Sequence, residues 1–251
     1  MNANKLINLP KEDFKHCIQG GDSLTFDNRF FSGKTLSKQD ILNIADYLQE
    51  HPEIKTLTLA SIGIQPEACE LLGSVLANKS LTELQILSMS IGDEGAKAIA
   101  KGLAANKTLQ ILNLDGNEIG DDGAKAIFKE IGIRTYLADL SITNNKIGDE
   151  SVKTIVGALK ANETLEKLCL KGNKFTDEGI EALSSFYAEV PREVAIDIIK
   201  PKVSSLQALS FQAVKKAYVE KKKKNEKEDV KKIEEDLKKI ENVIETSYRK
   251  K

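Results

Sequence analysis

Acidic residues occur in pairs at a constant spacing, and paired carboxylates can serve acid–base catalysis or bind a metal ion. The pairs are Asp93-Glu94, Asp121-Asp122, Asp149-Glu150 and Asp177-Glu178, each 28 residues after the one before. A catalytic or metal site has no reason to recur with such a period. Each pair also precedes apolar residues at helical spacing, and carboxylates at a helix start accept bonds from unpaired N–H groups and favour the helix dipole. The spacing therefore favours helix capping.

Three Asn-x-Ser/Thr sequences would be candidate glycan acceptors in a secreted protein. They are Asn78-Lys79-Ser80, Asn106-Lys107-Thr108 and Asn162-Glu163-Thr164. All three occupy one position between a helix and the next strand, where Asn suits the left-handed conformation that ends helices. We interpret them as structural.

His16-Cys17 could suggest a thiol site, but no second His or Asp/Asn partner is spaced to complete it. With only two His in the chain, a histidine-based metal or acid–base centre is not expected. The glycines fall at recurring positions, such as Gly95 and Gly123, and form no phosphate-binding loop. We therefore predict no enzymatic activity, no metal and no cofactor.

The elements that position these residues come from an internal repeat. Four segments nearly superimpose, and their first leucines lie 28 residues apart, at Leu81, Leu109, Leu137 and Leu165. Each segment follows the pattern L-x-x-L-x-L-x-x-N-x-I and then Gly-Asp-Glu-Gly or a near copy. The alternating leucines predict a short strand, the Asn a tight turn, and the apolar residues that follow a helix.

A variant unit starts at Ile54 and a truncated one at Ile196. One unit cannot cover its own apolar face, so such units stack. The predicted fold class is therefore α/β, a right-handed solenoid with a curved parallel sheet on its concave face and helices on its convex face.

This pattern resembles the ribonuclease-inhibitor class of leucine-rich repeats over roughly residues 54–199. The resemblance implies that the concave face grips a partner protein, often an enzyme that is thereby blocked. Two departures make the first turns less regular. Ile62 and Met89 replace the turn Asn, and Ala68-Cys69 replaces a Gly-Ala pair.

The repeat sets the expected domain boundaries. Residues 1–53 are predicted to form an N-terminal cap, 54–199 the solenoid, and 200–251 a helical C-terminal cap with a basic amphipathic tail. In the cap, Leu24 and Phe26 imitate the strand, and a helix starts between Ser37 and Asp40.

The tail carries apolar residues at heptad spacing, namely Val230, Ile233, Leu237, Ile240 and Ile244. Three interpretations stay open: a helix folded against the rest of the chain, a coiled coil between chains, and a membrane-surface helix. A Glu-rich amphipathic C-terminus on such repeats also resembles translocated effectors of intracellular bacteria, such as those of Legionella.

The net charge of −1 hides an asymmetry, because residues 200–251 carry 16 Lys and Arg against 9 Asp and Glu. The tail is therefore +7 and the remaining residues −8. An acidic body argues against nucleic-acid binding. The start lacks the apolar core of a signal peptide, no run of apolar residues is long enough to span a membrane, and three Cys form no disulfide framework. We expect a chain that is cytoplasmic or translocated into a host cytosol, and monomeric apart from a coiled-coil contact of the tail.

Strand alternation identifies the residues of the concave face. The predicted partner-binding residues are Thr56, Thr58, Glu83, Gln85, Leu87, Met89, Ile111, Asn113, Asp115, Asp139, Ser141, Thr143, Lys167, Cys169 and Lys171. Ala60 belongs to the same face, and Thr25 and Asp27 extend it into the cap.

Leu87 and Ile111 are expected to lie side by side near Met89, as an apolar centre ringed by acidic residues. The prediction is a non-enzymatic interaction module that binds a protein with a basic patch, such as an enzyme that it blocks or modulates. The alternative is a scaffold or oligomerisation protein that acts through its C-terminal helix.

Overall fold

The computed structural model describes residues 5–6, 11–134, 136–180, 182–183 and 195–197. All of them belong to one compact unit that spans Met1–Ile198. The predicted C-terminal cap and tail, including the helix expected at 226–248, lie outside the described residues.

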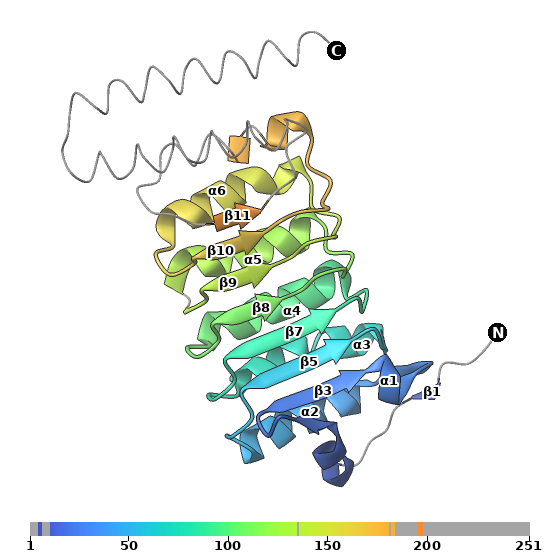
Figure 1. The fold of residues 1–251 in the computed structure, drawn as a ribbon. Helices are drawn as coiled ribbons and strands as arrows, with labels where there is room; N and C mark the ends of the chain where they lie inside the picture. Colours follow the sequence, from blue (N-terminus) through green and yellow to red (C-terminus); the bar gives the residue numbers. More distant parts are fainter. Residues whose placement is uncertain (1–4, 7–10, 135, 181, 184–194, 198–251) are drawn as a thin grey trace. The chain divides into compact units, whose positions relative to one another are not determined.

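Eight strands form one sheet in the order β11-β10-β9-β8-β7-β5-β3-β2, and Figure 1 shows them stacked one after another. Their bounds are β2 Ile18–Gln19, β3 Ser23–Asp27, β5 Thr56–Ala60, β7 Glu83–Leu87, β8 Ile111–Asn113, β9 Asp139–Ser141, β10 Lys167–Cys169 and β11 Ala195–Asp197. Every neighbouring pair is parallel except β2 and β3. A second sheet joins β1 (Lys5–Leu6), β4 (Lys34–Leu36) and β6 (Gly63–Ile64).

Helical segments alternate with the strands along the chain. They are η1 Lys11–Cys17, α1 Asn28–Phe31, α2 Lys38–Glu50, α3 Pro66–Cys69, η2 Leu72–Ala77, α4 Gly92–Ala105, α5 Asp121–Arg134, η3 Asp149–Ser151 and α6 Val152–Ala161. Figure 1 shows α4, α5 and α6 as a layer behind one face of the sheet. A parallel sheet with helices on one face confirms the predicted α/β class and the strand–turn–helix units.

The core consists of rows of aliphatic side chains that run across the strands. One row is formed by Leu57, Leu84, Leu112, Leu140 and Leu168, which the pairing register places side by side and which are all fully buried. The helices close this core with residues at helical spacing, such as Ile99 and Leu103 of α4.

The first full unit is less regular than the later ones, as its sequence predicts. Its helix is divided into α3, which has 4 residues, and the 3-10 segment η2. Ile62 and Met89, which stand in the place of the turn Asn, are both 3% exposed. They contribute apolar packing where the later units have polar side chains.

The turn asparagines bind backbone groups, and these groups belong mostly to the neighbouring repeat. The Asn145 side-chain oxygen accepts from the N–H of Asn117 and of Ile119, each at 3.0 Å. Its side-chain nitrogen donates to the carbonyl of Leu114 at 3.0 Å. Asn117 and Asn145 are buried, so these bonds satisfy backbone groups that water does not reach.

The asparagines of the Asn-x-Ser/Thr sequences are also buried, but the expected left-handed backbone is wrong. Asn106 has φ −79° and ψ 138°, which is extended, and Asn78 and Asn162 are alike. The Asn106 side chain instead donates to the carbonyl of Leu76 at 2.8 Å and accepts from the N–H of Leu109 at 2.8 Å. It joins the end of one repeat to the start of the next.

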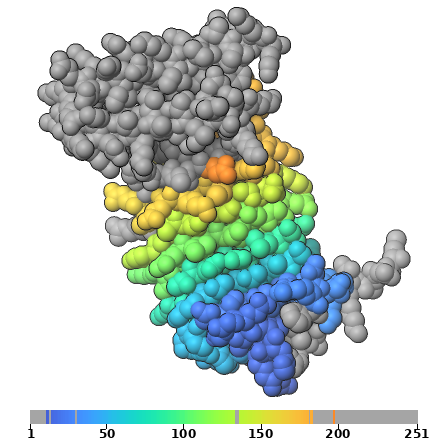
Figure 2. Space-filling view, in the orientation of Figure 1, coloured from blue at the N-terminus to red at the C-terminus, as the bar shows by residue number. Residues whose placement is uncertain are grey.

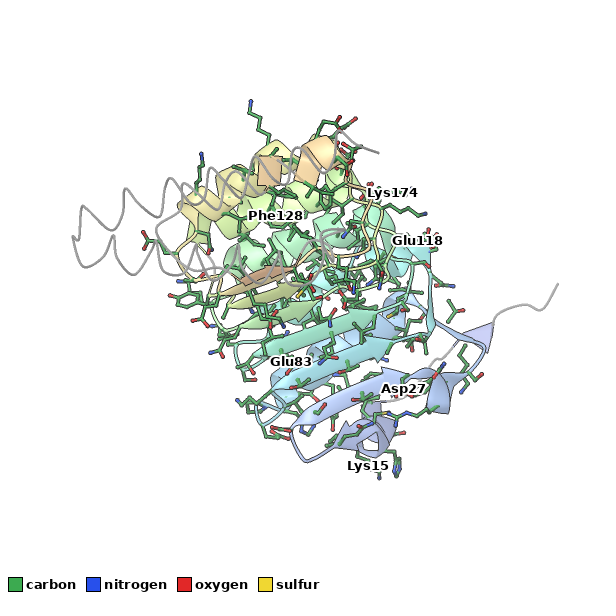
Figure 3. The ribbon with its side chains drawn as sticks, turned by 45° about the horizontal axis from the view of Figure 1, so that its top comes forward. Lys15, Asp27, Glu83, Glu118, Phe128 and Lys174 are labelled. Carbon is green, nitrogen blue, oxygen red and sulfur yellow. The ribbon has the colours of Figure 1, made fainter. Side chains whose placement is uncertain are left out.

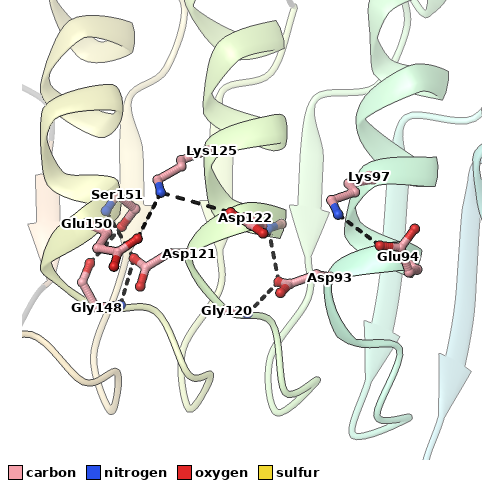
Figure 4. A network of polar contacts seen from close by, with 11 residues as sticks. Asp93, Glu94, Lys97, Gly120, Asp121, Asp122, Lys125, Gly148, Glu150 and Ser151 are labelled. Atoms are coloured by element: carbon pink, nitrogen blue, oxygen red, sulfur yellow. Dashed lines mark hydrogen bonds and ion pairs between the residues drawn. The ribbon is translucent and has the colours of Figure 1, made fainter.

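In the pairs that begin at Asp93 and Asp121, the first acid caps a helix, but not the helix on which it stands. Asp93 accepts from the N–H of Gly120 at 2.7 Å and of Gly123 at 2.9 Å, both in the next repeat (Figure 4). Asp121 does the same for Gly148 and Ser151, each at 3.0 Å. Capping was predicted correctly and its target was not, because local sequence does not show which stacked helix lies closer.

The second acid of each pair faces outward. Glu94 pairs with Lys97 at 2.8 Å, and Lys125 of α5 approaches Glu150 at 3.2 Å (Figure 4). Because Glu94 and Glu150 are largely exposed, solvent screens these pairs and they contribute little to stability.

Asp121 and its neighbour Asp122 offer a matched test of capping between repeats. Asp121→Ala should lower the free energy of unfolding by about 1 kcal/mol, since it leaves two N–H groups of the next repeat unpaired. Asp122→Ala removes the same charge and should change stability by less than about 0.5 kcal/mol. Urea unfolding gives the energies. Hydrogen exchange should quicken at Gly148 and Ser151 in the first variant alone, and faster exchange at the start of α5 instead would refute capping in the next repeat.

Asn106→Ala tests whether the Asn-x-Ser/Thr residues are structural. It strands the buried N–H of Leu109 and should lower stability by about 2–3 kcal/mol. Lys107→Ala, in the same sequence but exposed, should stay within about 0.5 kcal/mol of the parent chain. Equal unfolding midpoints for the two variants would contradict the structural assignment.

Candidate functional site

The face of the sheet opposite the helices presents three rows of side chains, which we call the open face. The first row is Thr56, Glu83, Ile111, Asp139 and Lys167, and the second is Thr58, Gln85, Asn113, Ser141 and Cys169. The third row contains Ala60 and Leu87, which are paired, followed by Asp115, Thr143 and Lys171 at the repeat spacing. Figure 2 shows this face as successive bands of colour, and Figure 3 labels Glu83 on it.

These rows contain every predicted binding residue except Met89, and each row member is half-buried or exposed. Met89 packs in the core and is withdrawn from the candidate set. Thr25 and Asp27, the extension into the cap, are 6% and 8% exposed and are also withdrawn. The accessible part of the open face therefore starts at β5.

The expected apolar centre is not formed, because Leu87 and Ile111 do not lie side by side. The register pairs Ile111 with Glu83, at the start of β7, whereas Leu87 ends that strand beside Ala60. Along β7, Leu87 lies four residues beyond Glu83, the partner of Ile111, which is a distance of about 13 Å. The physical reason is the period, because neighbours across this sheet are 28 residues apart and these two are 24 apart.

Charge on the open face is partly neutralised within the face. Lys167 pairs with Asp139 at 2.9 Å across β10 and β9. The hydrogen bond and the negative charge of Asp139 raise the pKa of Lys167, so Lys167 stays charged through the physiological range. This pair separates an acidic region on β7 and β8 from Lys171 at the other end of the face.

The two acids of that region have neutral partners. Glu83 accepts bonds from Gln85 and from the hydroxyl of Thr56, and no Lys or Arg of the described residues pairs with it. Asp115 accepts from the hydroxyl of Ser141 and the N–H of Thr143, both at 2.7 Å. Both carboxylates therefore keep a net negative charge for a partner to meet.

Cys169 is half-buried in the middle row, and burial raises the pKa of its thiol, while the charge of Lys167 opposes that rise. The three cysteines form no disulfide. Cys17, whose neighbour His16 had suggested a thiol site, is 5% exposed and packs in the core.

One exposed residue was missed by the reasoning from sequence. Tyr136 is 58% exposed just before β9. A signal was present, since Arg134-Thr135-Tyr136 replaces the Asn-x-Ser/Thr sequence that three other units carry.

In the part of the chain that the structure describes, no helix is both long and apolar enough to cross a membrane. No group of three or more His, Cys, Asp or Glu within that part is placed to hold a metal ion.

The repeats match a known family. A family model described as "Leucine Rich repeat" matches residues 77–100, 105–128, 135–156 and 161–184. These four segments are therefore similar to leucine-rich repeats. Each match contains one strand of the sheet, from β7 to β10, and the helical residues that follow it.

Among curated proteins, no sequence matches this chain. Among solved structures, one similar chain is described as "Leiomodin-1 Actin-Binding Site 2 (ABS2)", with 26% sequence identity and a TM-score of 0.46. The match covers 58% of this chain and 88% of that one.

The raised pKa of Cys169 predicts slow alkylation. The folded protein should react with iodoacetamide at Cys169 severalfold more slowly near pH 8 than the urea-unfolded chain, because less thiolate is present. Lys167→Ala should slow it further, since the ammonium favours the thiolate. Site-resolved mass spectrometry measures the rates across pH, and equal rates in folded and unfolded chains would contradict the assignment.

Proposed function

We propose that this chain is a protein-binding module that holds a partner protein on the open face of its leucine-rich repeats. The observation that carries the proposal is a contrast between adjacent rows. The buried row is Leu at each of the five strands β5 and β7 to β10, whereas the first open row is Thr, Glu, Ile, Asp and Lys. Close packing requires the same residue type at every buried position of the row. The open positions vary from strand to strand, which is typical of a surface that recognises a specific partner.

The proposal assigns binding and no reaction. The acids with the most regular spacing do not converge on a point, since Asp93 and Asp121 each cap a different helix and their neighbours form exposed ion pairs. A binding role uses the strand side chains directly, and these project from a rigid sheet.

The charges on β7 and β8 suit a partner with a basic patch. Neither Glu83 nor Asp115 forms an ion pair with a Lys or Arg of the described residues, and an opposite charge on the partner would speed and orient its approach. We propose further that occupation of this face blocks or modulates a partner enzyme. The resemblance to translocated effectors would place that enzyme in a host cell.

Two substitutions on adjacent strands test the open face. Thr58→Arg with Gln85→Arg, which the register places side by side, adds bulk and positive charge at its centre. A partner captured from cell extract and then purified should bind this variant at least about tenfold more weakly than the parent chain, a loss typical of a disrupted interface centre.

Ala104→Arg is the matched control, because Ala104 is exposed on the helix α4. It should leave the Kd unchanged, and circular dichroism should show both variants folded. A partner that tolerates both open-face arginines and is lost with Ala104→Arg would place binding on the helices and refute the proposal.

A further inference from the structure

Among the described residues, only two large apolar side chains are classed as exposed, Ile111 at 38% and Tyr136 at 58%. Both belong to the amino-terminal side of neighbouring strands, since Ile111 starts β8 and Tyr136 shortly precedes β9. Asp139, the strand partner of Ile111, follows Tyr136 by three residues, which span at most about 11 Å, so one segment of a partner can reach both side chains. Apolar groups exposed on an otherwise polar surface are typical of an interface.

Tyr136 occupies a position that the repeat otherwise gives to a small polar residue. Residues 28 before and after it are Thr108 and Thr164. The backbone N–H of each donates to the Asn two residues earlier, at 2.9 and 3.0 Å. In the unit of Tyr136, Arg134 stands in the place of that Asn. With 58% of its surface exposed, Tyr136 offers little packing.

The charges beside Ile111 are unequal. The register places Ile111 between Glu83 and Asp139 on the two adjacent strands, each about 5 Å away across the sheet. Asp139 is paired with Lys167 at 2.9 Å, whereas Glu83 accepts from Gln85 and Thr56 and forms no ion pair with any described Lys or Arg. An apolar side chain is therefore bordered by one uncompensated carboxylate.

We propose that Glu83, Ile111 and Tyr136 form a docking surface, which we call the amino-end patch, for a peptide segment of the partner protein. That segment carries large apolar side chains next to a Lys or Arg. Its apolar side chains cover Ile111 and Tyr136, and the cation pairs with Glu83. The inference rests on the proposed function and deepens it, because it moves the centre of binding from the middle row to the amino-terminal end of β7 to β9.

A random peptide library displayed on phage provides the probe. It is selected on the immobilised full-length chain, and enriched peptides are synthesised and their Kd measured by fluorescence polarisation. The expected peptides share an apolar residue beside Lys or Arg. Tyr136→Thr, which restores the residue found at the equivalent positions, and Ile111→Thr, which keeps a β-branched residue in the strand, should each raise the Kd about tenfold or more.

Matched variants separate the ring and the charge from the rest of the face. Tyr136→Phe keeps the ring and should retain binding. Glu83→Gln should weaken binding severalfold and reduce its salt dependence. Leu87→Thr, at the opposite end of β7 on the same face, should leave the Kd unchanged.

The outcomes distinguish this inference from the proposed function. Peptides weakened by Thr58→Arg with Gln85→Arg but not by Tyr136→Thr or Ile111→Thr would overturn the amino-end patch and leave the open face in place. Peptides affected by none of these substitutions would overturn both. A library that yields no enriched peptide would also overturn the patch.

Discussion

Side-chain hydrogen bonds between neighbouring repeats hold this protein in its 28-residue register. Asn145 satisfies backbone groups of the repeat before it, and Asp121 satisfies N–H groups of the repeat after it. Without a neighbour, these buried groups would lose their partners at a cost comparable to a broken hydrogen bond each. A repeat is therefore stable only within the stack, which couples the units more tightly than apolar packing alone would.

These bonds also have a direction. Each capping aspartate acts on the helix that follows, so α5 and α6 are capped by the previous repeat. The start of α4 receives no side-chain cap, because Gln65-Pro66 stands where an aspartate would be needed. The unit that starts at Ile54 departs from the repeat sequence. This departure accounts both for its divided helix (α3 and η2) and for the uncapped start of α4 in the next unit. The turn asparagines and capping aspartates lie outside the open face, although Asp115 on that face also accepts from the N–H of Thr143 in the next repeat.

Spacing alone predicted the strand–turn–helix units, the buried leucine rows and the turn asparagines, because each depends on contacts within a unit or between equivalent positions. The predictions that failed depend on the stack. The helix capped by Asp93 is set by how two repeats pack, and the conformation of Asn106 by a carbonyl 30 residues earlier. The separation of Leu87 and Ile111 follows from the sequence, because the two residues are 24 apart and neighbours across these strands are 28 apart. The prediction grouped them because both are aliphatic residues on the open side of adjacent strands.

The rigidity of the open face lowers the entropy cost of binding a partner. Because the bonds between repeats fix the strands before a partner arrives, little conformational entropy is lost there on binding, and a small number of anchors suffices. The remaining charges define a direction along the sheet. Glu83 on β7 pairs with no Lys or Arg in the described part of the chain, Lys171 follows β10, and three strand spacings of about 5 Å separate these strands. A partner with unevenly distributed charge would meet this face in one orientation, so specificity arises from the order of the repeats as well as from their side chains.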